Sequence, residues 1–250
     1  MSEGRDDTVG LSLKTLAKRL GDPIFWALSK AELHRLLTQH PSGHSTDILP
    51  ITRTYRGWGW YKRLGAFQVD SEFQRLADWA AAERPETVME IGTFVGATLL
   101  LWSRVAQRRV ISVDLPGGIH GGGYPTEKMR LFREFVFDRP EVTIDLLHAD
   151  SQDVATRRRV EAMLGATRID LLFIDGDHRL EGVTRDFELW KDLVRPGGRI
   201  VFHDVVPHHT QPSCQVDVLW NNIKARYPGQ TTEIVESVDQ GWAGIGILTV

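Results

Sequence analysis

The feature that most constrains this chain is a regular alternation of short apolar runs and helix-length segments, which begins at Thr87. The runs are rich in Val and Ile, as expected of strands that are buried on both faces of a parallel sheet. They are Thr87–Ile91, Val110–Val113, Val142–Leu147, Ile169–Ile174, Arg199–His203, Glu233–Val238 and Gly244–Val250. Helices are predicted between the first six runs, at Ala97–Ala106, Thr126–Phe137, Ser151–Leu164, Leu180–Val194 and Gln215–Tyr227. This alternation predicts a doubly wound α/β domain.

The last two predicted strands lie too close in the sequence to be parallel neighbours. Residues Asp239 to Ala243 are all that separates them, whereas a parallel crossover needs about a dozen residues or more. We therefore expect a Rossmann-like, seven-stranded sheet whose last strand is antiparallel. Dinucleotide-binding Rossmann domains usually lack such a terminal hairpin.

Composition and charge exclude several classes of protein. The net charge is −3, and the one dense basic cluster, Arg157–Arg159, is interpreted as a solvated helix face, so we expect no nucleic-acid partner. The single cysteine, Cys214, cannot form an internal disulfide. Met1–Thr8 has no signal-peptide core, and no apolar run is long enough to span a membrane. We expect a cytoplasmic homo-oligomer without membrane contact.

The first predicted strand runs directly into a glycine turn, Glu90-Ile91-Gly92-Thr93-Phe94-Val95-Gly96. Two glycines allow a tight turn and a close approach of the backbone before the next helix. Their G-x-x-x-G spacing differs from the G-x-G-x-x-G of dinucleotide-binding turns. Taken alone, such a turn is as often structural as functional.

Acidic residues at the ends of five consecutive strands make the case stronger: Glu90, Asp114, Asp150, Asp175 and Asp204. Ligands of doubly wound sheets bind beyond the carboxyl ends of the strands. A carboxylate at the end of the second strand can accept both hydroxyls of a ribose, and the Asp150-Ser151 pair can bond an adenine amine and cap the next helix. The pattern predicts a site for a nucleoside-containing cofactor.

These motifs, together with the Pro196-Gly197-Gly198 turn, resemble class I S-adenosylmethionine-dependent methyltransferases. More narrowly, Asp114–Gly118, Gly121–Pro125 and Asp175–His178 resemble the metal-dependent natural-product O-methyltransferases, a group with macrolide-sugar, rhamnosyl and cephalosporin hydroxylase-like members. The resemblance covers roughly residues 55–250. It implies that S-adenosylmethionine is held by Glu90, Gly92, Thr93, Phe94, Gly96, Asp114, Leu115, Asp150, Ser151 and Asp175.

A divalent metal, Mg²⁺ or Mn²⁺, is expected between Asp175 and Asp204, because these residues end adjacent strands. Such an ion would lower the pKa of an acceptor hydroxyl. The resembled enzymes carry two acidic residues at the end of the fifth strand, whereas this chain has His203-Asp204. With His203 as a ligand, the site could favour Mn²⁺, Fe²⁺ or Zn²⁺ over Mg²⁺, be weak, or be absent.

His178 is the expected general base, with a pKa near neutrality, and Asp177 is the second candidate or a helix cap. His208 and His209 are expected at the pocket rim or in solvent. The expected reaction is methyl transfer to a hydroxyl of a small metabolite, such as a sugar of a natural product. Alternatives are a metal-independent methyltransferase, a nicotinamide-dependent oxidoreductase, a non-haem iron hydroxylase and a non-catalytic binding domain. The lack of an Asn-Pro-Pro-Tyr motif after the fourth strand argues against N-methylation.

Residues 1–67 are expected to form a helical and lid-like segment before a catalytic domain at 68–250. Two separate amphipathic helices are predicted, at Leu11–Leu20 and Pro23–Gln39, with Asp22 as the N-cap of the second. A further helix is expected from Asp70 to about Glu83. The aromatic segment Tyr55–Tyr61 could be an acceptor-binding lid, or equally a subunit interface.

Overall fold

The computed structural model describes residues 13–40, 48–117, 122–237 and 239–250. In these residues seven strands form one mixed sheet in the order β3-β2-β1-β4-β5-β7-β6. The strands are β1 Thr87–Ile91, β2 Arg109–Asp114, β3 Thr143–His148, β4 Ile169–Ile174, β5 Val194–His203, β6 Thr231–Ile234 and β7 Ile245–Thr249. Neighbours among β1–β5 are parallel, and β7 is antiparallel to both β5 and β6. The predicted seven-stranded sheet with a reversed last strand is confirmed.

Helices connect the strands and extend the chain at its N-terminal side. They are α1 Leu13–Gln39, α2 Ile48–Thr54, α3 Asp70–Glu83, α4 Ala97–Val105, α5 Met129–Arg133, α6 Val154–Leu164, α7 Leu180–Trp190 and α8 Val216–Arg226, with the short 3-10 helices η2 Gly59–Tyr61, η4 Thr126–Lys128, η5 Glu134–Val136 and η6 Lys191–Leu193. Within the described residues, no helix has the length and apolar character needed to cross a membrane.

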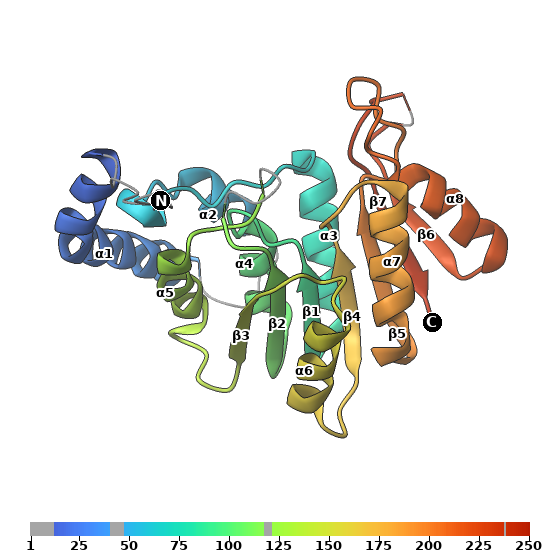
Figure 1. Cartoon of the computed structure of the whole chain (residues 1–250), viewed down its shortest axis with the longest axis horizontal. Coiled ribbons are helices and arrows are strands. Elements are labelled where there is room, and N and C mark those ends of the chain that lie inside the picture. The colour runs from blue at the N-terminus through green and yellow to red at the C-terminus, as the bar shows by residue number, and fades with distance from the viewer. Residues whose placement is uncertain (1–12, 41–47, 118–121, 238) are drawn as a thin grey trace, which may run out of the picture.

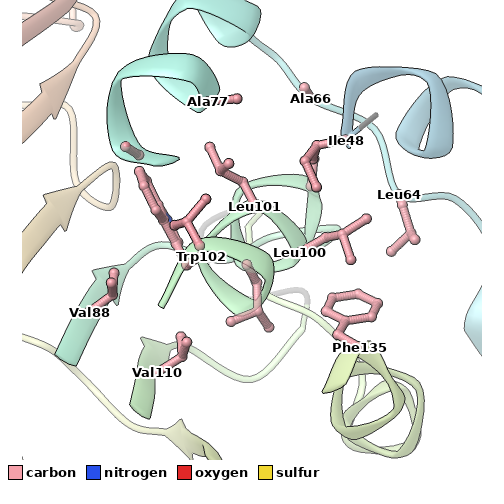
Figure 2. Close-up of a cluster of buried hydrophobic side chains, with 14 of the residues drawn as sticks. Ile48, Leu64, Ala66, Ala77, Val88, Leu100, Leu101, Trp102, Val110 and Phe135 are labelled. Carbon is pink, nitrogen blue, oxygen red and sulfur yellow. The ribbon is translucent and has the colours of Figure 1, made fainter. Parts of the chain in front are cut away.

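The sheet is the middle of three layers, with α6 and α7 in front of it and α4 behind it in Figure 1. Side chains alternate along each strand, so Val88 and Val110 pack on the α4 side while Met89 and Ile111 pack against the opposite face. Figure 2 shows the buried cluster on the α4 side of the sheet, in which Trp102 and its neighbours on α4 pack among α2, α3 and the strands.

Several predicted boundaries differ from the structure. The predicted helix at Ser151 begins instead at Val154, because Asp153 is its N-cap and accepts a bond from the Ala155 amide. The Pro196-Gly197-Gly198 segment is not a turn before β5 but part of it, at a register irregularity that a φ of +74° at Gly197 permits. Glu233 lies near the end of β6 rather than at its start. Residues 1–10, Leu11, Gly118, Gly121 and Val238 lie outside the described residues.

The two amphipathic stretches near the N-terminus form one helix, α1, which continues through Pro23. Asp22 is therefore not a cap. Its carboxylate instead accepts the Tyr61 hydroxyl at 2.8 Å and pairs with Arg130 at 3.1 Å. Side chains of α1 and α2 join the same buried cluster as α3 and α4.

The aromatic segment Tyr55–Tyr61 packs against α1 rather than over the ends of the strands. Tyr55 and Tyr61 are buried, and the Tyr61 ring lies 5.2 Å from that of Trp26. Backbone amides of Arg56 and Gly57 donate to Glu32 of α1. The acceptor-lid and subunit-interface interpretations of this segment both stay predictions.

Candidate active site

A cavity of about 850 Å³ opens at the carboxyl ends of the parallel strands. Sites for small molecules typically measure about 300–1,000 Å³, so this cavity could hold one. Loops after β1 to β5 and the loop between β6 and β7 line it. Eleven predicted site residues line it: Gly92, Phe94, Asp114, Leu115, Asp150, Ser151, Asp175, Asp177, His178, His203 and Asp204. Among the described lining residues, Glu90, Thr93 and Gly96 are not found.

The glycine turn after β1 brings the backbone against the neighbouring strand end. Gly92 has a φ of +85°, and a Cβ there would collide with the carbonyl oxygen of Asp175. Its amide donates to Val113 of β2 at 3.0 Å, and the Asp175 amide donates to Ile91 at 2.9 Å. Glycine at this position lets the ends of β1, β2 and β4 meet beside the cavity.

Asp114 holds the glycine turn in place from the end of β2. Its Oδ2 accepts the amides of Thr93 at 2.9 Å and Phe94 at 2.7 Å, and its Oδ1 accepts the Leu115 amide at 2.8 Å. The carboxylate also lines the cavity, where its remaining lone pairs can accept ribose hydroxyls. Asp114 therefore lies where the sequence predicted, and it also holds the glycine turn, which the sequence did not reveal.

Glu90 lies beneath the turn and not in the cavity, which corrects the expectation of direct cofactor contact. The side chain is fully buried, and its carboxyl accepts the Thr93 hydroxyl at 2.7 Å and the Trp102 indole at 3.1 Å. Burial raises its pKa to about 8. Thr93 is buried beside Glu90. Gly96, with a φ of +95°, is the N-cap of α4 and lies against the Phe132 ring. These residues therefore support the turn from the protein interior.

Asp150 and Ser151 lie together in the cavity wall after β3, as expected for an adenine site. Neither caps α6. Ser151 donates its hydroxyl to Asp186 of α7 at 2.7 Å, so its oxygen is left to accept a bond from a ligand. Asp186 is fully buried, and burial raises its pKa to about 7. Because Asp186 lies within a helix, this contact could not be predicted from the sequence.

The side chains after β4 and β5 form one compact cluster of Asp175, His178, His203 and Asp204. His178 Nδ1 lies 2.9 Å from Asp204 Oδ2, and its Nε2 lies 3.3 Å from Asp175 Oδ1. His203 Nδ1 lies 3.1 Å from Asp175 Oδ1 and 3.5 Å from Asp204 Oδ1. The sequence prediction that Asp175 and Asp204 share one rim of the sheet is confirmed.

Asp204 adopts an unusual backbone conformation at the end of β5. Its φ is +61°, in the left-handed region that non-glycine residues rarely adopt. The Ala243 amide, in the loop before β7, donates to Oδ1 of Asp204 at 3.1 Å and holds the carboxylate toward the cluster. Such conformations gather at functional sites, where surrounding contacts maintain them.

Charge balance in the cluster changes the expected role of His178. Burial alone would lower the pKa of His178, but its hydrogen bonds with Asp175 and Asp204 outweigh burial and raise the pKa far above its ordinary value. Burial likewise opposes the charged form of Asp175, but His203 and His178 outweigh it and hold its pKa below the usual range. The sequence predicted a pKa near neutrality for His178, whereas in this arrangement the two carboxylates beside the ring raise its pKa.

Asp177 is paired within its own loop. The Arg179 guanidinium donates to Asp177 Oδ2 at 2.6 Å and lowers the pKa of the carboxyl. Arg179, not Asp177, is the N-cap residue of α7. The predicted cap is therefore wrong, and the ion pair leaves Asp177 a weaker base than an unpaired carboxylate.

Three contributors to the cavity were not found from the sequence. Gln68, before α3, donates from Nε2 to Asp175 Oδ2 at 3.2 Å, and its Oε1 is buried without a partner among the described residues. The exposed aromatic side chains of Phe67 and Trp242 also line the cavity. Their neighbours in sequence carry no catalytic pattern, so their placement follows from tertiary contacts.

Of His208, His209 and Cys214, only His208 is among the described residues that line the cavity. His208 lines it, in agreement with the expected rim position, whereas the His209 ring lies against Gly241. Cys214 is buried, with Sγ 3.7 Å from Asp204 Oδ2 and 4.0 Å from His178 Nδ1.

Comparison with known proteins adds a family match. Residues 89–205 match a model described as a methyltransferase domain. The chain is similar to uncharacterized protein R132 of Acanthamoeba polyphaga mimivirus, with 29% identity over 168 residues that cover 61% of this chain and 72% of that protein.

Two solved structures share the fold. An O-methyltransferase from Bacillus cereus in complex with S-adenosylhomocysteine has 17% identity and a TM-score of 0.53, covering 88% of this chain and 91% of its own. A candidate O-methyltransferase from Klebsiella pneumoniae has 17% identity and a TM-score of 0.52, covering 94% of this chain and 99% of its own.

Proposed function

We propose that this chain, whose residues 89–205 match a methyltransferase-domain model and whose fold is shared with an O-methyltransferase, is a class I S-adenosylmethionine-dependent methyltransferase that methylates an oxygen of a small hydroxylated metabolite. The acceptor class is a sugar or another natural-product hydroxyl, and a divalent metal assists. The observation that carries the proposal is one cavity that joins Asp114 and Asp150 to the cluster of Asp175, His178 and Asp204. The Bacillus cereus O-methyltransferase, which shares the fold, supports oxygen as the acceptor atom.

The two ends of the cavity would serve the two substrates. Asp114 would accept the ribose hydroxyls, and Asp150 with Ser151 would contact the adenine. The backbone of the turn from Gly92 to Phe94 would border the methionine portion. The sulfonium donor is already activated, so the main task of these residues is to align its methyl group with the acceptor oxygen.

The donor set of the cluster fits a divalent ion. Asp175, His203 and Asp204 each offer a ligand atom, and these atoms lie within 4.8 Å of one another. Two carboxylates supply the negative charge that a dication needs, and their oxygens are hard ligands. A bound ion would act as a Lewis acid on the acceptor hydroxyl and would neutralise the carboxylates that otherwise hold the His178 proton.

His178 is the residue best placed to take the acceptor proton. Its side chain is 34% exposed and lines the cavity, whereas His203 and Asp204 are almost fully buried. If Asp175 and Asp204 bound the divalent ion, the His178 ring would lose both counter-charges, and its pKa would fall toward the value at which it is neutral. Asp177 is the second candidate, although its pairing with Arg179 counts against it.

A specific observation favours metal-independent methyl transfer as the second candidate function. The His178 ring bridges both carboxylates at 2.9 and 3.3 Å, and His203 Nδ1 lies 3.1 Å from Asp175, so two protonated histidines would balance the two carboxylates without any ion. A chelator separates the two possibilities, because it stops metal-dependent transfer and leaves metal-independent transfer unchanged.

The test measures S-adenosylhomocysteine formed from S-adenosylmethionine, with catechol and methyl rhamnoside as probe acceptors. A positioned base contributes ~10²–10⁴-fold, so His178→Ala should lower turnover by that order while calorimetry shows unchanged S-adenosylhomocysteine affinity. His208→Ala is the matched control, since His208 lines the same cavity outside the cluster. A methyl group located on carbon by NMR, or no S-adenosylhomocysteine binding, would contradict the proposed function.

A further inference from the structure

His203 is buried at the end of β5, next to the carboxylates of Asp175 and Asp204. Its side chain is 4% exposed, and Nδ1 lies 3.1 Å from Asp175 and 3.5 Å from Asp204. The second ring nitrogen, Nε2, is buried and has no hydrogen-bond partner among the described residues. The two nearby carboxylates are thus the polar groups that the described part of the chain supplies to this ring.

A buried polar side chain of this kind needs a partner, because an unmet hydrogen-bonding group in the interior costs about 1–3 kcal/mol. The ring also lines the cavity, so a ligand can reach it. The nitrogen that faces Asp175 and Asp204 is Nδ1, and one ring nitrogen with an oxygen of each carboxylate makes a set of ligand atoms within 4.8 Å of one another. The set contains two hard carboxylates and one borderline imidazole.

We propose that this cluster binds a first-row transition-metal dication, with His203 as a ligand, and that His203 makes it discriminate against Mg²⁺. The inference deepens the proposed function and rests on its metal-assisted form. Mg²⁺ prefers oxygen ligands in a near-ideal octahedron and keeps several waters. Imidazole suits later first-row ions such as Fe²⁺ and Zn²⁺ better than Mg²⁺, and the affinity of a given site rises from Mn²⁺ to Co²⁺.

Two variants test the contribution of the His203 ring to metal binding. His203→Asp replaces the imidazole with a third carboxylate and should shift the preference toward Mg²⁺. Cys214→Ser is the matched control, because its Sγ lies 3.7 Å from Asp204 but outside the proposed ligand set. Circular dichroism and S-adenosylhomocysteine affinity verify that each variant is folded.

The experiment titrates the metal-free full-length protein with Mg²⁺, Mn²⁺, Co²⁺ and Zn²⁺ by calorimetry. Loss of an outer-shell partner already changes metal affinity about 10- to 100-fold; exchanging a ligand should therefore lower the Co²⁺-to-Mg²⁺ affinity ratio at least as much in His203→Asp. Cys214→Ser should keep the wild-type ratio. Electron spin-echo spectroscopy of the Mn²⁺-loaded protein should show ¹⁴N coupling that disappears in His203→Asp.

Each outcome decides. Tighter binding of Co²⁺ than of Mg²⁺, together with the ¹⁴N coupling, supports the proposal. Equal or tighter Mg²⁺ binding, or coupling that survives in His203→Asp, overturns it while leaving metal-assisted methyl transfer intact. A lost preference in Cys214→Ser would assign the selectivity to the thiol and overturn the role of His203. No metal binding, with methyl transfer retained, would overturn the inference together with the metal-assisted mechanism but not methyl transfer itself.

Discussion

Glu90→Gln should make the stability of this protein less sensitive to pH, because Glu90 is fully buried beneath the glycine turn. Burial raises its pKa from 4.5 to about 8, and the nearby charges of Asp114 and Asp175 act in the same direction. The folded protein therefore holds a proton here over a pH range in which the unfolded chain has released it. Glutamine has nearly the same shape and carries no proton to release; its single oxygen can accept the Trp102 indole N–H, and its NH2 group can donate to the Thr93 hydroxyl oxygen.

The sign and size follow from proton linkage. A raised folded-state pKa gives a contribution that is fully present below pH 4.5 and is lost as the pH rises toward 8. Each pH unit between these values lowers the free energy of unfolding by about 1.4 kcal/mol, for a total of about 5 kcal/mol. Relative to the wild type, Glu90→Gln should gain this amount with rising pH and then level off above pH 8.

Urea unfolding of both proteins between pH 5 and 9 measures the effect. The difference between the two free energies cancels the titration of every group that the variant leaves unchanged. Parallel curves across this range would refute the reasoning, because they would show that Glu90 ionises normally. Since Glu90 does not line the cavity, S-adenosylhomocysteine affinity at pH 6 should also be nearly unchanged.

Two further predictions concern the walls of the cavity. Asp114→Asn removes charge-assisted bonds from the Thr93 and Phe94 amides, each worth about 1.5–3 kcal/mol, so S-adenosylhomocysteine affinity should fall at least about tenfold in calorimetry. Asp145→Asn, on β3 and paired with Arg109, is its control, and equal affinities would disprove the role of Asp114. Trp242→Ala removes an aromatic wall worth about 1 kcal/mol, so KM for a catechol probe should rise about fivefold. The equally exposed Trp58 provides the control variant, and an unchanged KM in Trp242→Ala would exclude this wall from acceptor binding.

The sheet could be predicted because its determinants are local. Buried parallel strands are continuous apolar runs, and the short spacing before β7 forces an antiparallel pair. Parallel pairing then carries the residues that follow each strand to one edge, so Asp114, Asp175 and Asp204 were expected beside one cavity and lie there. Boundaries failed where a nearby side chain decided them, as at Asp153, which caps α6 in place of Ser151.

The immediate partners of the site residues could not be predicted, because they come from distant parts of the chain. Gln68 reaches Asp175 across 107 residues, and the Ala243 amide reaches Asp204 across 39. The same limit explains two departures from expectation. Glu90 has the spacing of a cofactor ligand but lies below the turn, and His178 has the spacing of a base with a near-neutral pKa but lies between two carboxylates that raise its pKa.

These distant contacts also connect the proposed acceptor wall to the acidic cluster. Phe67 and Trp242 are exposed aromatic residues of the cavity wall, and each is adjacent in sequence to a residue bonded to a cluster carboxylate. Gln68 bonds to Asp175, and Ala243 bonds to Asp204, so each aromatic residue is held one position away from an acidic side chain. A shift of either carboxylate would therefore move an aromatic wall with it. Cluster variants should accordingly change acceptor KM as well as turnover, whereas variants at Asp150, on the proposed nucleoside side, should leave acceptor KM unchanged.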